Sequence, residues 1–177
     1  MKKASETIYW DALNFGSKNF YLATTGKGIL IIKLDPSYES FADFVKKRVP
    51  NPVLVQDPQR LEECSRQLTE YFEGKRTVFD LPFDLRGTAF QVAVWEALAR
   101  VPFGKTCSYA DIAREIENEK AVRAVGNACG LNPLIVVVPC HRILGKDGGL
   151  HGFSAVGGLT TKEEFLQHER NGVKNSF

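Results

Sequence analysis

The stretch SYADIAREIENEKAVRAVGNACG, residues 108–130, has the pattern of two short helices joined by a tight polar turn. Ser108 followed by Asp111 is a capping-box pattern, which predicts that the first helix begins directly after Ser108. The polar residues 117–119 make the turn, and the second helix is expected to end at Gly130. Such a pair satisfies the geometry of a DNA-binding helix-turn-helix, and an ordinary helical hairpin fits the same pattern.

The surface of the second helix is unusual for a protein that recognises base edges in the major groove. Its small residues offer little to hydrogen-bond with bases; they are Ala121, Ala124, Gly126 and Ala128. Such a face suits a close approach to a backbone or to a shallow groove, with Arg123 as its long polar side chain. Close packing between helices explains the same small residues, so the spacing leaves both interpretations open.

Around this helix pair the sequence predicts two lobes, 1–86 and 87–177, with a joint at Arg86-Gly87 where the composition changes. In the second lobe, Thr88 with Gln91 forms another capping box and predicts a further helix. The first lobe is expected to contain strands at 20–24, 28–34 and 53–55, a helix at 37–48, and a helix ending near Gly74 with Cys64 on its core face.

These elements predict an α/β fold. The N-terminal lobe is expected to have a small mixed β-sheet with helices and a mainly structural role. The C-terminal lobe is expected to be mostly helical, with a winged-helix-like helix-turn-helix for binding DNA.

The composition excludes several broad classes of protein. The chain has 177 residues, 44% of them hydrophobic, and a net charge of +2, which indicates a globular protein that is not strongly basic. No apolar segment approaches the length of a membrane span, so we expect a cytoplasmic monomer with no membrane partner. The four cysteines lack the close-pair spacing of a zinc or disulfide site, and we predict no metal and no cofactor.

The stretch VVVPCHRIL, residues 136–144, places an apolar run and a proline directly before Cys140, His141 and Arg142. A strand ending at the proline would present a nucleophilic thiol next to a base and a fixed cation. Cysteine is also among the most buried residue types, so Cys140 can equally be a core residue. These residues alone support the two interpretations about equally.

Five segments together resemble the alkylguanine-DNA alkyltransferases, the suicide DNA-repair proteins. They are FQVAVWEAL, VPFGKTCSYADIA, AVRAVGNACGLNP, VVVPCHRIL and GGLTTKEEFLQHE, and they span about residues 87–169 in the family's order and spacing. The resemblance implies an irreversible, single-turnover transfer of an alkyl group from guanine O6 in double-stranded DNA to Cys140, on an expected acceptor strand. Thymine O4 is a second candidate position of the lesion. His141 would relay the thiol proton through a water towards Glu169.

The resemblance also implies how the damaged nucleotide is handled. Tyr109 is expected to donate a hydrogen bond to guanine N3 and to help rotate the nucleotide out of the duplex, while Arg123 takes its place in the base stack. The small-residue helix would then lie in the minor groove. Asn132 is expected to brace the turn before the acceptor strand.

The pocket for the extruded guanine is expected to lie beside Cys140. Phe153 would form an aromatic wall and Ser154 would offer a backbone N–H near O6, on a loop that is longer than in some relatives. The carbonyls of Cys140 and Ile143 would recognise the guanine amino group. Cys129 stands where relatives often carry a larger apolar residue, which would make this pocket roomier.

Two other functions fit parts of the pattern. A non-enzymatic lesion sensor of the alkyltransferase-like group binds the same damage but lacks the acceptor cysteine, which Cys140 supplies here. An unrelated cysteine hydrolase would use the Cys–His pair with repeated turnover, and it would not need Arg123 on a small-faced helix.

Overall fold

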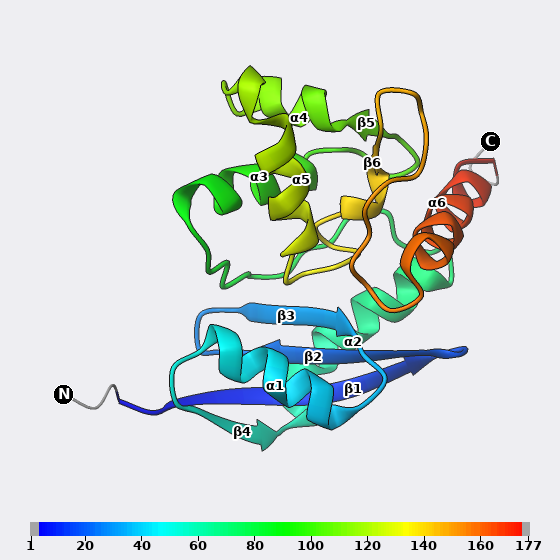
Figure 1. Cartoon of the computed structure of the whole chain (residues 1–177). Helices are drawn as coiled ribbons and strands as arrows, with labels where there is room; N and C mark the ends of the chain where they lie inside the picture. The colour runs from blue at the N-terminus through cyan, green and yellow to red at the C-terminus, as the bar shows by residue number, and fades with distance from the viewer. Residues whose placement is uncertain (1–3, 175–177) are drawn as a thin grey trace. The chain divides into compact units, whose positions relative to one another are not determined.

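The computed structural model describes residues 4–174, and it has the α/β fold that the sequence predicts (Figure 1). The chain forms two compact units, Met1–Leu85 and Arg86–Phe177, which we call the N-terminal and C-terminal units. The division falls one residue before the joint expected at Arg86-Gly87. Among residues 4–174, none of the helices combines the length and apolarity needed to cross a membrane.

The N-terminal unit is built on a four-stranded sheet of order β3-β2-β1-β4. Its strands are β1 (Glu6–Phe15), β2 (Lys18–Thr24), β3 (Ile29–Leu34) and β4 (Pro52–Gln56). The sheet is mixed, as predicted, because β1 pairs antiparallel with β2 and parallel with β4. The sequence did not predict β1, because only Ile8 in this strand is buried and the charged Asp11 interrupts any apolar alternation.

Two helices complete the N-terminal unit, and both were predicted. α1 (Tyr38–Arg48) begins after Ser37, and α2 (Pro58–Phe72) begins after Asp57; in each case the capping side chain accepts a backbone N–H of the first turn. Cys64 lies on the core face of α2 as expected, and burial raises the pKa of its thiol to about 12.

The two helices cover opposite faces of the sheet. Neighbouring residues of a strand point to opposite faces. On β2, Tyr21 stacks on Phe41 of α1 with ring centroids 5.1 Å apart, whereas Phe20 packs on Phe72 of α2 at 5.3 Å. The N-terminal unit therefore has a helix–sheet–helix layering of its own.

The C-terminal unit is mostly helical, as predicted. Its regular elements are α3 (Ala89–Ala99), β5 (Cys107–Ser108), α4 (Tyr109–Glu115), α5 (Val122–Gly130), β6 (Ile143–Leu144) and α6 (Gly158–Lys174). Both predicted capping boxes are present, one formed by Thr88 and Gln91 and the other by Ser108 and Asp111. A 3-10 turn at Glu119–Ala121 joins α4 to α5, and these elements form the predicted helix-turn-helix.

The segment before Cys140 corrects one expectation, because it is a series of turns rather than an acceptor strand. Val136 has a φ of 73°, a left-handed conformation that a β-branched residue seldom adopts. Pro139 lacks an N–H for a sheet ladder, and Cys140 begins a short 3-10 turn. Strand pairing starts only at Ile143, where β6 runs parallel to β5.

Candidate active site

Cys140 lies in the interior of the C-terminal unit beside the side chain of Asn132. Cys140 is 5% exposed, and Asn132 Nδ2 donates to its Sγ at 3.2 Å and to the carbonyl of Val138 at 2.7 Å. Asn132 Oδ1 accepts the Leu134 N–H at 2.9 Å. One amide side chain therefore binds both the turn before Cys140 and the sulfur itself. Because it forms hydrogen bonds with backbone groups of this segment, it favours turns over a strand.

The environment of the Cys140 thiol favours the protonated form. Burial raises the pKa of this thiol. The Asn132 hydrogen bond, the charge of Lys162 and nearby backbone N–H groups act in the opposite direction without cancelling the effect of burial. Because the thiolate is the nucleophilic form, reaction at neutral pH requires a base that removes the thiol proton.

A buried ion-pair network surrounds the carboxylate of Glu169. His141 Nε2 lies 2.7 Å from Glu169 Oε1, and Arg142 binds the same carboxylate with two contacts of 2.9 Å, from Nε to Oε2 and from Nη2 to Oε1. The Gly104 N–H donates to Oε2 at 3.1 Å, and Arg142 Nη1 donates to the carbonyl of Val101. His141 and Glu169 are 0% and 1% exposed. The paired contacts between Arg142 and Glu169 compensate for taking these two charges out of water.

Burial favours the neutral form of His141, and the contact with Glu169 sets which ring nitrogen carries the proton. Burial lowers the pKa of His141, and this effect exceeds the raising effect of Glu169. Burial alone would raise the pKa of Glu169, but the hydrogen bonds and charges of His141 and Arg142 hold it below its ordinary value. A neutral imidazole beside a carboxylate donates its Nε2–H, which leaves Nδ1 unprotonated. His141 Nδ1 is buried and has no hydrogen-bond partner among residues 4–174, so it is the available base.

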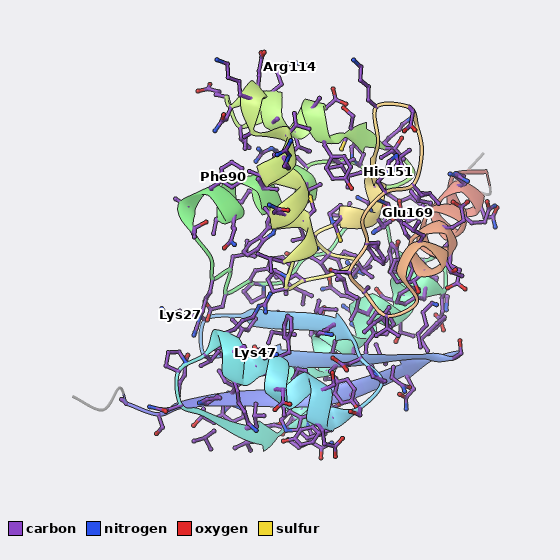
Figure 2. All side chains as sticks on the ribbon, in the orientation of Figure 1. Lys27, Lys47, Phe90, Arg114, His151 and Glu169 are labelled. Atoms are coloured by element: carbon purple, nitrogen blue, oxygen red, sulfur yellow. The ribbon has the colours of Figure 1, made fainter. Side chains whose placement is uncertain are left out.

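Tyr109, at the start of α4, contacts the loop of residues 145–157. Its Oη donates to the carbonyl of His151 at 3.1 Å, and Lys162 Nζ donates to the same oxygen at 2.7 Å. Figure 2 shows His151 on this loop and Glu169 on α6, the helix that also carries Lys162. Burial raises the pKa of Tyr109 to about 12, so its hydroxyl keeps its proton at neutral pH and can act as a donor.

The same loop brings two predicted pocket residues towards α6 and α5. The ring of Phe153 meets Phe165 edge to face, with centroids 6.3 Å apart, and Phe165 also meets the ring of His141 at 5.4 Å. Ser154 Oγ donates to the carbonyl of Gly130 at 2.8 Å. Aromatic packing thus connects the loop to the histidine of the ion-pair network.

The exposed part of α5 carries Arg123 with small neighbours. Arg123 and Ala124 are exposed, whereas Ala121 and Gly126 are half-buried. A shallow depression runs along residues 120–124 and includes Asn127. This surface has room for a close approach by a partner, and the exposed Arg123 lines the depression.

Ala128 does not belong to that exposed face, which corrects the prediction for this residue. It is 2% exposed, and its carbonyl accepts the indole N–H of Trp95 at 2.9 Å, because this end of α5 packs on α3. Cys129 and Ile143, two predicted pocket residues, are 5% and 0% exposed. Burial raises the pKa of the Cys129 thiol to about 12.

Two cations at the site have contacts that the sequence prediction did not include. Arg142, the cation that follows Cys140 and His141 in the sequence, binds Glu169 directly. Lys162 is fully buried, and its position on α6 follows the i, i+3 and i+7 spacing shared with Phe165 and Glu169. That spacing was the available signal for a lysine facing inward. Within residues 4–174, no cluster of three or more histidine, cysteine and acidic side chains could hold a metal ion.

Comparison with known proteins matches both units of the chain. Residues 8–85 match the family model of the 6-O-methylguanine DNA methyltransferase ribonuclease-like domain, and residues 89–171 match that of the DNA binding domain. The inducible methylated-DNA--protein-cysteine methyltransferase of Bacillus subtilis is 43% identical over 171 residues, covering 96% of this chain and 94% of that protein. The methylated-DNA--protein-cysteine methyltransferase of Methanosarcina barkeri is 42% identical over 170 residues, and the alignment covers 94% of this chain and 100% of that protein.

Solved structures agree with these matches. The O6-methylguanine methyltransferase of Mycobacterium tuberculosis superposes with a TM-score of 0.80 at 34% identity, covering 93% of each chain. A structure described as the OGT of the same organism in complex with DNA also gives a TM-score of 0.80 at 34% identity, covering 94% of each chain. With both units matched and relatives aligned over almost their whole length, this chain belongs to the 6-O-methylguanine DNA methyltransferase family.

Proposed function

We propose that this chain repairs DNA by direct reversal, as a methylated-DNA--protein-cysteine S-methyltransferase that moves an alkyl group from guanine O6 to its own Cys140. The observation that carries the proposal is the pairing of a held thiol with a neighbouring base. Asn132 Nδ2 donates to Cys140 Sγ at 3.2 Å, and the next residue, His141, has a buried Nδ1 with no hydrogen-bond partner among residues 4–174. The membership of the family supports the same reaction. Thymine O4 is a second candidate position of the lesion.

The proposed reaction is a displacement at the alkyl carbon. His141 Nδ1 takes the proton of the Cys140 thiol through a water, and Glu169 stabilises the resulting imidazolium. The thiolate then forms a bond to the alkyl carbon while the bond from that carbon to guanine O6 breaks, and its electron pair leaves with the base. Tyr109 donates a hydrogen bond to guanine N3, which stabilises the charge of the leaving base. The product thioether is stable, so each molecule reacts once.

No cofactor is needed for this chemistry, because the protein itself supplies the nucleophile and the base. We assign the alkyl transfer and DNA binding to residues 87–177 and a mainly structural role to residues 1–86. A monomer in the cytoplasm is the expected working form.

The proposed partner is double-stranded DNA with an alkylated guanine. The alkyl carbon cannot meet a thiolate inside a base-paired duplex, so the nucleotide must be rotated out. We assign Arg123 to the vacated position in the stack. Ala121 directly before α5, with Ala124 and Gly126 on α5, would allow close approach to the minor groove. Undamaged pairs should be harder to extrude, because unstacking and unpairing cost least for a lesion that pairs poorly.

The extruded guanine is proposed to lie between Cys140 and the loop of residues 145–157. Phe153 would form one wall, and the backbone N–H of Ser154 would lie near O6. The carbonyls of Cys140 and Ile143 would accept from the guanine amino group. Cys129 would border the pocket, where its small side chain leaves more room than a larger apolar residue.

The first test is the mass of the intact protein and of its peptides after reaction with excess duplex containing O6-methylguanine. We expect one methyl group on the peptide that carries Cys140, with one lesion lost per protein molecule. Cys140→Ala should gain no methyl group, whereas Cys64→Ala, a matched change of a buried thiol in the N-terminal unit, should react like the wild type.

Each alternative function predicts a different outcome of that experiment. DNA binding without a change in protein mass would overturn the proposal in favour of a lesion sensor. Loss of many lesions per protein molecule would overturn it in favour of a hydrolase with turnover.

A further inference from the structure

The most unusual polar group of the C-terminal unit outside the proposed reaction is the ammonium of Lys162. Lysine is almost never fully buried unless it is paired, yet Lys162 is 0% exposed. Its Nζ donates to the carbonyl of His151 at 2.7 Å. Taking an ammonium out of water is unfavourable, so a buried lysine with one specific backbone partner beside a reactive thiol indicates a specific role.

The partner of Lys162 is a loop that contacts the site at several points. Residues 145–157 connect β6 to α6 (Figure 1). Besides the His151 carbonyl, the loop is held by the Ser154 hydroxyl, which donates to Gly130 O, and by the packing of Phe153 on Phe165. Among these contacts of the loop, the hydrogen bond from Lys162 is the one with a charged donor.

The His151 carbonyl receives two donors, and the two have different tasks. Tyr109 Oη lies 3.1 Å from this oxygen and Lys162 Nζ lies 2.7 Å from it, which a carbonyl with two lone pairs can accept together. If the Tyr109 hydroxyl donates to the leaving guanine, it must release His151. Lys162 then keeps the loop attached while Tyr109 acts on the base.

We propose that Lys162 is a positioning residue for the alkyl transfer, which holds the loop of residues 145–157 through the His151 carbonyl, so that the loop stays attached when the Tyr109 hydroxyl turns to the extruded base. This inference rests on the proposed function. It goes beyond that function because it assigns a separate residue, on α6, to the loop that closes the guanine pocket.

The charge of Lys162 supports the same role. Its positive charge acts on the Cys140 thiol in the direction that lowers its pKa, against the larger raising effect of burial. Burial lowers the pKa of Lys162 itself, and the neighbouring thiols Cys140, Cys129 and Cys107 act in the opposite direction. A cation placed here therefore favours the thiolate in addition to holding the loop.

The test is Lys162→Met, which keeps a long side chain but removes the charge and all donors. We expect faster amide hydrogen exchange in residues 150–154, and an alkyl transfer rate at saturating O6-methylguanine duplex that falls by about 10-fold to 100-fold, as misplaced reacting groups do. Lys162→Arg should restore part of both properties, because it keeps a charged donor. The matched control is Lys146→Met on the exposed part of the same loop, which should change neither property.

The two readouts separate this inference from the proposed function. If amide hydrogen exchange in residues 150–154 of Lys162→Met is unchanged, Lys162 does not hold the loop and the inference is overturned, whatever the alkyl transfer rate. Faster exchange with an unchanged transfer rate at saturating duplex would overturn the role in positioning. A wild-type protein that transfers no methyl group would instead overturn the proposed function. The two failures can be told apart because amide exchange in the loop is measured without substrate. An equal rise in exchange throughout the C-terminal unit would show a merely structural lysine and would overturn the inference as well.

Discussion

Two of the clusters in which arginine pairs with glutamate lie in contrasting environments, one on the surface of the N-terminal unit and one inside the C-terminal unit. On α2, Arg66 pairs with Glu63 and Glu70, and its side chain is 50% exposed. In the C-terminal unit, Arg142 pairs with Glu169, and their side chains are 7% and 1% exposed. The same chemical groups therefore meet once in water and once in a dry interior.

The two environments change what the pairing does. Solvent and salt screen the exposed pairs, so the loss of one partner leaves the other well hydrated. The Arg66 hydrogen bond lowers the pKa of Glu63 to about 2 at an exposed position. At Glu169, burial by itself raises the pKa of the carboxyl. The hydrogen bonds and charges of His141 and Arg142 outweigh this effect, so the pKa is lowered. Only the buried cluster links the stability of its unit to the protonation of a proposed catalytic base.

The largest expected effect follows from removing the buried carboxylate charge. Glu169→Gln keeps the shape of the side chain but leaves the Arg142 guanidinium without a counter-ion in the interior. We expect the free energy of unfolding to fall by about 3–5 kcal/mol, as for other broken buried ion pairs. Urea unfolding measures this change. The alkyl transfer rate should also fall by about 100-fold or more, because the imidazolium of His141 loses its stabilising charge.

A double variant separates the two effects of this substitution. Arg142→Met combined with Glu169→Gln removes the unpaired charge, so stability should recover in part while the transfer rate stays low. Recovery of the rate along with the stability would contradict the catalytic role of Glu169. A single Glu169→Gln variant as stable as the wild type would contradict the comparison between the two clusters.

A smaller effect is expected from acid. The pKa of His141 is lowered in the folded protein, so below the unfolded-state pKa of about 6.5 the unfolded chain binds a proton that the folded chain does not. The contribution of this group to the free energy of unfolding is therefore fully present above pH 6.5. It falls as the pH decreases, by at most about 1.4 kcal/mol per pH unit. The lowered pKa of Glu169 acts in the same direction, and its contribution is lost as the pH falls further, through its folded-state pKa.

Urea unfolding at several pH values between 7 and 5 measures the acid effect. His141→Asn should flatten the dependence in this range, because it removes the buried titrating group. His151→Asn is the matched control, since the His151 side chain is 57% exposed, and it should leave the dependence as in the wild type. A wild-type stability that does not change between pH 7 and 5 would contradict the buried, neutral state of His141.

The parts of the fold that the sequence predicted are those set by local contacts. The capping boxes at Thr88 and Ser108 join residues three apart, so the beginnings of α3 and α4 could be found from the sequence. β1 could not, because its strand conformation depends on pairing with β2 on one side and β4 on the other. The apolar run 136–138 resembled a strand, but the side chain of Asn132 binds the Leu134 N–H before this run and the Val138 carbonyl at its end, which favours turns.

The candidate site shows the same limit. The stretch VVVPCHRIL itself indicated Cys140 and His141 as a thiol beside a base, whereas Glu169 was predicted only through resemblance, since nothing local relates a glutamate on α6 to a histidine 28 residues earlier. Lys162 was missed because a lysine in a polar helix is normally exposed. Only the tertiary packing of α6 turns Lys162 and Glu169 inward, so their partners could not be derived from the sequence alone.

The smallest expected effect belongs to the exposed cluster. Arg66→Ala removes the cation that pairs with Glu63 and Glu70, and alanine keeps the helix propensity of this position in α2. The two glutamates remain hydrated, so we expect the urea midpoint and the transfer rate to match the wild type within error, and any residual difference to shrink as salt is added. Unfolding in low and high salt, beside Glu169→Gln, makes the comparison direct. A loss of stability that persists in high salt would show that exposure does not decide the value of these pairs, and that the α2 cluster is coupled to the core of its unit through contacts other than charge.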